Sequence, residues 1–225
     1  MKYFLIVFSL LILLTSCLGE KKYADFVYNK YNSQTQAADL TKDAPDYISV
    51  NTDSSINKLD TLVVAKKIKS QFIPAILYWQ WENTIRCELD PRISIQTFNK
   101  YLFSYADSAN LKERLNGQKL ELSINDLPNS FVYTHKGNSI ILLIAYTVND
   151  TEAIIPENKD VKISYRLVKD NIETKKGTLL IPDETQPMQN IWKSTQKFTW
   201  SYMSQYDNNL QKLSKNVIDK ILTEI

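Results

Sequence analysis

The 225-residue chain is poor in the residues that most often carry chemistry or build tight loops: it has one histidine, two cysteines and four glycines. His135 and the two cysteines cannot supply the usual zinc spacings, which need four ligands. No stretch has the alternating acidic residues and glycine of a calcium loop. A glycine-rich phosphate loop and a Gly-x-Ser-x-Gly elbow are also missing from the sequence. The sequence therefore predicts no metal site and no cofactor.

Basic and acidic residues are nearly balanced in number. The chain has 27 basic and 25 acidic residues, which gives a formal net charge of +2 with histidine neutral. A nucleic-acid-binding domain needs a clustered basic face, and we expect no nucleic-acid partner. The length is sufficient for one domain that buries its own core without disulfides.

The first seventeen residues carry the clearest signal. Lys2 is followed by an apolar run, 4–14, and then by Leu14-Thr15-Ser16-Cys17. A charged start, an apolar stretch and small residues before a cleavage point are typical of a secretory signal peptide. The run is too short to span a bilayer, which takes about 20 residues. An ordinary signal peptide with an incidental cysteine is the alternative.

The last four residues of this segment resemble the lipobox of bacterial lipoproteins. The resemblance implies cleavage between Ser16 and Cys17, a diacylglyceryl group on the Cys17 thiol and a fatty acyl group such as palmitate on the new amino terminus. The partner it implies is the membrane of the cell envelope. Leu18, rather than aspartate, follows the cysteine, which favours the outer membrane if the host has two membranes.

This signal divides the chain into three parts. Residues 1–16 are expected to be the signal peptide, residues 17–60 the lipidated cysteine and a polar tether, and residues 61–225 a single domain. Within the tether, aromatic residues between 23 and 31 are spaced for a short amphipathic helix. If residues 18–45 were coil, the tether would span about 30 Å.

The domain is expected to be α+β, with an antiparallel β-sheet packed against a mid-chain helix and a long C-terminal amphipathic helix. Residues 76–89 alternate between apolar and polar, which predicts a long half-buried strand. A helix capped by Ser94 is expected next. The residues Lys136-Gly137-Asn138 indicate a hairpin turn. The apolar residues 139–148 predict a central strand covered on both faces, and Pro187 suits the first turn of the C-terminal helix.

Two groups of side chains could carry chemistry, and both have a simpler interpretation. Glu82 and Glu88 lie on one face of the predicted strand, but six residues correspond to about 20 Å, too far for a glycosidase pair. Cys87 has no disulfide partner once Cys17 carries lipid, and its apolar neighbours favour a small buried side chain.

The aromatic residues are the remaining candidates for binding. Trp79 and Trp81 share a face of the predicted strand, and with Tyr78 they could form a platform for a sugar ring or a lipid chain. The alternative, which we favour, is core packing under the C-terminal helix, where Trp192 and Trp200 could meet them.

The order of elements from residue 62 to 225 resembles the small outer-membrane lipoproteins that are auxiliary to ABC-type lipid transport systems, and the lipopolysaccharide-assembly lipoproteins. The resemblance implies a non-catalytic partner of an envelope complex and carries over no binding residues. We therefore expect a membrane-anchored envelope lipoprotein with a binding or assembly role. The alternatives are a carbohydrate- or lipid-binding surface lipoprotein that uses its aromatic residues, and an envelope hydrolase.

Overall fold

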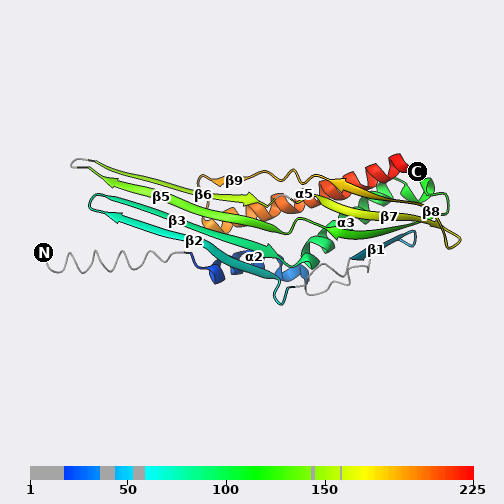
Figure 1. Ribbon diagram of the computed structural model, residues 1–225, viewed down its shortest axis with the longest axis horizontal. Coiled ribbons are helices and arrows are strands. Elements are labelled where there is room, and N and C mark those ends of the chain that lie inside the picture. The colour runs from blue at the N-terminus through cyan, green and yellow to red at the C-terminus, as the bar shows by residue number, and fades with distance from the viewer. Residues whose placement is uncertain (1–17, 36–43, 53–58, 143–144, 158) are drawn as a thin grey trace.

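Two β-sheets follow one another along the long axis of the molecule, and the C-terminal helix contacts strands of both (Figure 1). The computed structural model describes residues 18–35, 44–52, 59–142, 145–157 and 159–225. The first sheet has the order β1-β4-β7-β8 and the second has the order β2-β3-β5-β6-β9. Only β1 and β4 pair in parallel among these strands.

The strands differ in length between the two sheets. Those of the first sheet are β1 (Ile48–Thr52), β4 (Lys119–Asp126), β7 (Val161–Lys169) and β8 (Ile172–Ile181). Those of the second sheet are β2 (Val63–Ala75), β3 (Tyr78–Leu89), β5 (Ser130–Ile141), β6 (Tyr146–Pro156) and β9 (Met188–Asn190). Helices α2 (Glu20–Thr35), α3 (Pro91–Ser108), α4 (Leu111–Arg114) and α5 (Thr195–Glu224) complete the described chain. The expected α+β class, the mid-chain helix and the long C-terminal helix are confirmed.

The mid-chain helix α3 begins earlier than the sequence indicated. The buried Asp90 is its N-cap and accepts a hydrogen bond from the Arg92 backbone N–H at 2.8 Å, and Pro91 occupies the first turn, where no N–H is needed. Ser94, the expected cap, lies one turn inside the helix instead. Its Oγ is 2.6 Å from the hydroxyl of Tyr206, so it joins α3 to α5 in the core.

The segment that was expected to be a tether is largely part of the folded body. Helix α2 buries Tyr23, Val27 and Tyr31 completely, at the four-residue spacing that places side chains on one helix face. The Trp200 indole N–H of α5 donates to the Phe26 carbonyl at 2.8 Å. Of the predicted range 17–60, residues 17, 36–43 and 53–58 lie outside the described residues, whereas α2 and β1 are elements of the core.

The predicted turn at 136–138 and the predicted central strand at 139–148 are wrong. Strand β5 runs through Gly137, and the chain reverses after Leu142, whose backbone N–H donates to the Ala145 carbonyl at 2.7 Å. Residues 146–148 begin strand β6 and are exposed. The apolar run therefore marks the two sides of a hairpin at an open end of the sheet, and not a strand covered on both faces.

The C-terminal helix begins at Thr195, capped by Ser194, and not at Pro187. Residues 188–190 form strand β9 before the helix begins. Trp192 is 94% exposed, so it meets neither Trp79 nor Trp81. Pro74 lies within β2, which is an edge strand, where a residue without a backbone N–H can be accommodated.

Candidate functional site

The long strands of the second sheet extend well past the helices, as Figure 1 shows at the end of the molecule opposite the C-terminus. We call this projecting part the ribbon end: residues 70–81 of β2, β3 and their turn, and residues 137–142 and 145–149 of β5 and β6. Ile76 at its tip is 94% exposed, and Phe72 and Tyr146 are 60% and 64% exposed. This surface is the largest group of exposed apolar side chains in the described chain.

The two faces of the ribbon end differ, and the face on the helix side is defined by Ile85 and Tyr133, which pair in register and are buried. Because alternate residues share a face, Trp81 and Trp79 continue the face of Ile85 beyond the helices. The register brings further apolar residues beside these two tryptophans: Phe72 and Pro74 from β2, and Ile141, Tyr146 and Val148 from β5 and β6.

A glycine allows one of these tryptophans to lie flat on the sheet. Gly137 pairs with Trp81, and a Cβ placed there would clash with the six-membered ring of Trp81 and with the Asn149 carbonyl oxygen. The Trp81 ring thus covers the Gly137 backbone and meets the His135 ring edge-on, with centroids 6.4 Å apart. Trp79 pairs with Ser139, which is buried. Both tryptophans are half-buried.

The opposite face of the ribbon end carries no charge and mixes polar side chains with Ile73 and Ile140. Gln80 pairs with Asn138 there, and Asn138 pairs in turn with Asn149. Tyr78 also lies on this face and donates its hydroxyl hydrogen bond to Gln80 Oε1 at 3.0 Å. The predicted platform of Tyr78, Trp79 and Trp81 is therefore split between two faces. Half-burial of the tryptophans also contradicts the favoured expectation that they are core residues.

Charge is absent from the ribbon end and begins abruptly at its base. No Asp, Glu, Lys, Arg or His occurs in residues 70–81 or 137–149 of the sequence. An ion pair and a histidine–carboxylate hydrogen bond flank the base: Lys69 Nζ lies 2.6 Å from Glu82 Oε2, and His135 Nε2 lies 2.6 Å from Asp150 Oδ1. The sequence contained this signal as two uncharged stretches, but neither stretch alone indicates that the fold brings them together.

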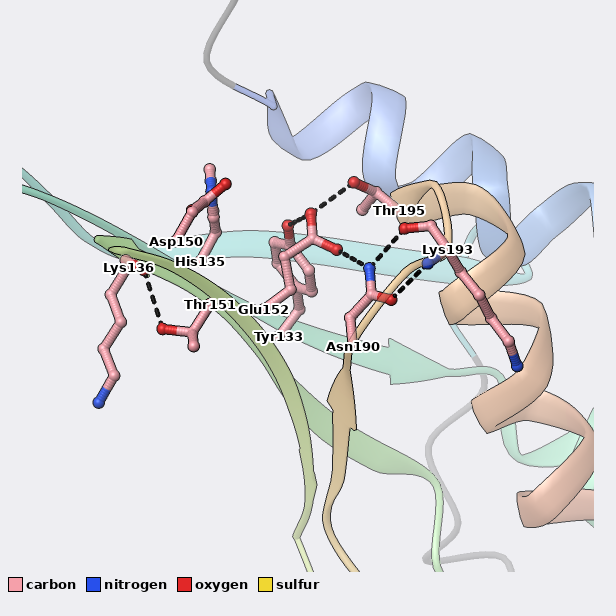
Figure 2. Close-up of polar contacts among 9 residues, drawn as sticks. All are labelled: Tyr133, His135, Lys136, Asp150, Thr151, Glu152, Asn190, Lys193 and Thr195. Atoms are coloured by element: carbon pink, nitrogen blue, oxygen red, sulfur yellow. Dashed lines mark hydrogen bonds and ion pairs between the residues drawn. The ribbon is translucent and has the colours of Figure 1, made fainter. Parts of the chain in front are cut away.

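The densest polar cluster lies just behind this base and is drawn in Figure 2. The Glu152 carboxylate accepts hydrogen bonds from Tyr133 at 2.8 Å, Thr195 at 2.6 Å and Asn190 at 2.5 Å. Burial, and then the hydrogen bond to Glu152, raise the pKa of the Tyr133 phenol. The three donors come from β5, the start of α5 and β9, so the carboxylate ties these three elements together.

The other residues considered for chemistry are separated or buried. Glu88 and Glu82 lie six residues apart on β3, and Glu82 is engaged by Lys69. Cys87 is fully buried, and burial raises the pKa of its thiol, as expected for a small core side chain. Within the part of the chain that the structure describes, no group of three or more His, Cys, Asp or Glu side chains could hold a metal ion.

The chain enters the fold at the base of the ribbon end. Asn83 Nδ2 donates to the Leu18 carbonyl at 3.1 Å, and the Lys67 backbone N–H donates to Glu20 Oε1 at 2.6 Å. Asn83 shares the helix-side face with Trp81, two residues away on β3. The first described residues are therefore fixed to the second sheet where its charges begin. The predicted cleavage and lipidation residues, Ser16 and Cys17, lie outside the described residues.

Over the described ranges no helix combines the length and the apolar character that crossing a bilayer requires. No family model matches the chain, and no curated protein or solved structure is significantly similar to it, so the candidate function rests on the geometry of the ribbon end.

Proposed function

We propose that the protein is a membrane-anchored lipoprotein of the bacterial cell envelope with a non-catalytic binding role, and that the ribbon end is its binding surface. The observation that carries the proposal is the exposed, uncharged apolar end of the second sheet. Contiguous exposed apolar patches in soluble domains mark sites of contact with proteins, membranes or ligands. The lipobox at Leu14 to Cys17 supports the membrane anchor and an envelope location, with the outer membrane favoured.

The polar side chains support binding rather than catalysis. The Glu152 carboxylate accepts hydrogen bonds from three neutral donors, Lys69 pairs with Glu82, and His135 is hydrogen-bonded to Asp150. A general acid or base needs a hydrogen-bonding position left open toward a substrate. A role beside an envelope transport complex, implied by the order of elements, is consistent with such a binding surface.

The experiment has two arms. Intact-mass analysis of the mature protein should find its amino terminus at Cys17 with the mass of the attached acyl groups, and Cys17→Ala should shift the protein out of the membrane fraction. The binding arm replaces an exposed apolar residue of the ribbon end, Phe72→Glu, and compares it with Ile172→Glu, a matched exposed residue of the first sheet.

Chemical cross-linking in intact cells is the readout of the binding arm. We expect the cross-linked products of the wild type to be lost in Phe72→Glu and retained in Ile172→Glu. Equal patterns in both variants would contradict a binding role for the ribbon end, and an unmodified Cys17 would contradict the anchor.

A second candidate function is carbohydrate binding, which the half-exposed Trp79 and Trp81 favour. Two residues apart on one strand, their indoles are about 7 Å apart and could stack on successive sugar rings. Soluble envelope oligosaccharides should then change the tryptophan fluorescence in a saturable way, and Trp79→Ala should abolish the change. No saturable change would exclude this candidate in favour of the first.

A further inference from the structure

The position of the uncharged ribbon end relative to the anchor indicates what it binds. We propose that the ribbon end docks into the lipid interface of the same bilayer that holds the Cys17 anchor, with its tip residues Ile76, Leu77 and Leu142 reaching the acyl region. The inference rests on the proposed lipid anchor and names the partner of the same surface. Three features of the described residues carry it: the charge boundary, the entry point of the chain and the open sheet edges.

The charge boundary fits the dimensions of a lipid interface. From Trp81 at the base to Ile76 at the tip is five residues, or about 17 Å at the rise of a strand, close to one leaflet of a hydrocarbon core about 30 Å thick. Both faces of the ribbon end are free of charge over this length, including the face turned away from the helices. A surface facing water has no reason to exclude charge, whereas a lipid interface does.

The aromatic residues are placed where an interface would hold them. Along β3, Trp81, Trp79 and Tyr78 lie between the charged base and the aliphatic tip, while Tyr146 of β6 pairs with Ile141 at the level of the tip. Indole and phenol rings concentrate at the headgroup level of membranes because one end of the ring system is apolar and the other forms hydrogen bonds. The order along the ribbon, from ion pairs through aromatic rings to aliphatic side chains, follows the order of environments across a leaflet.

The entry point of the chain places lipid beside this surface. The Leu18 carbonyl is held by Asn83 at the base of the ribbon end. Cys17 is joined to Leu18 by one peptide bond, so the Cα atoms of the two residues are about 4 Å apart, and the proposed acyl groups begin on the thiol and amino group of Cys17. Because this connection is so short, the bilayer that receives the acyl chains must lie close to Asn83, at the base of the ribbon end. The ribbon end extends from this base.

The open edges of the sheet limit how deeply the ribbon end can enter. β9 pairs only with residues 152–154 of β6, so residues 146–151 of β6 and the whole outer side of β2 have no strand partner among the described residues. Unpaired backbone groups are not tolerated in the hydrocarbon region. We therefore place the strand edges among the headgroups and only the tip side chains in the acyl region, with the ribbon end tilted and not spanning.

A second copy of the chain is the competing occupant, because an open edge strand can pair with another. If two copies paired through their edge strands, only the side chains along those edges would need to be apolar. The face turned away from the helices would remain free to carry charged side chains. Uncharged residues on both faces and the position of the anchor favour the bilayer instead.

The test places an environment-sensitive nitrobenzoxadiazole probe on the tip of the native lipoprotein through Leu142→Cys. The matched control carries the probe through Ile172→Cys, which is exposed at the hairpin of the first sheet. Cys87 is fully buried and will not compete for the label. Both proteins are reconstituted into vesicles of phosphatidylethanolamine and phosphatidylglycerol, floated, and checked by intact mass for acylation at Cys17.

We expect a blue shift and a several-fold rise in emission for the Leu142 probe, together with protection from iodide, and an aqueous spectrum for the Ile172 probe. The double variant Ile76→Lys, Leu77→Lys should abolish the shift, whereas Ile191→Lys, which is exposed outside the ribbon end, should not. All five substituted residues are exposed, so the unfolding curves of the variants should match that of the wild type.

Three results would overturn the inference. An acylated protein that floats while both probes stay aqueous refutes docking and leaves the lipoprotein proposal intact. A probe response that appears only at high protein-to-lipid ratio, with self-quenching between labelled copies, assigns the surface to a second copy. A protein without acyl groups that does not float refutes the proposed function and this inference together.

Discussion

Replacing Tyr23 by alanine tests whether the segment that follows the anchor is part of the core. Tyr23 is fully buried, and its ring lies 4.6 Å from that of Tyr133 and 6.4 Å from that of Phe131, measured between centroids. Burying a tyrosine removes about 150–250 Å² from water, at about 25 cal/mol per Å². Aromatic-to-alanine changes in cores cost about 3–5 kcal/mol, so we expect a loss of about 4 kcal/mol.

Thermal unfolding of the purified mature protein in a mild non-ionic detergent gives the readout. For a chain of this size each kcal/mol corresponds to about 2–4 °C, so the midpoint for Tyr23→Ala should fall by about 8–16 °C. Tyr28→Ala is the matched control, because Tyr28 is on the same helix but 39% exposed, and its change should stay within about 0.5 kcal/mol. Equal midpoints for the two variants would mean that α2 is not docked, and the reasoning would fail.

Three further changes probe other parts of the molecule. Gly137→Ala should displace the Trp81 ring, alter the near-ultraviolet circular dichroism and cost about 1–3 kcal/mol, and an unchanged spectrum would contradict the flat packing of that ring. Burial opposes ionisation of Asp90, but hydrogen bonds from Arg92 outweigh it and lower the Asp90 pKa; Asp90→Ala should therefore cost about 2 kcal/mol near neutral pH in denaturant unfolding. Because the folded pKa is depressed, this contribution is present above about pH 4 and is lost as the pH falls through the folded value, so the variant should lose less stability in acid than the wild type. Cys87 should resist thiol reagents until the protein is denatured and then titrate as the single free thiol of the acylated protein; two thiols would contradict lipidation of the other cysteine.

The sequence could predict the elements whose burial is periodic. The alternation through 76–89 became β3, and the amphipathic pattern near the end became α5. Each of these elements has one solvent-exposed face and one buried face, so the period of its apolar residues distinguishes a strand from a helix. The Asp90 cap was missed because a serine four residues later offered the same chemistry.

The wrong predictions share one physical cause. The apolar composition of a segment does not indicate whether other elements of the fold pack on it. Residues 139–148 satisfy the pattern of a buried strand, and only the fold shows that the helices stop before them. Conversely, the aromatic spacing between 23 and 31 predicted a helix, but the polar composition of 18–35 did not indicate that this helix, α2, is docked in the core. Phe72 and Tyr146 were missed as site residues because they join the tryptophans through strand pairing between distant parts of the chain.

The contact between α2 and α5 has a consequence for the order of events during folding. Trp200 and Phe26 are hydrogen-bonded although 174 positions separate them, and Tyr31 donates to Asp207 across 176 positions. Contacts of such high sequence separation form slowly, and here they need residues of α5 that are synthesised long after α2. Helix α2 must therefore remain undocked, with its aromatic side uncovered, until α5 has formed. Such a delay would make the newly synthesised chain a client for holding chaperones.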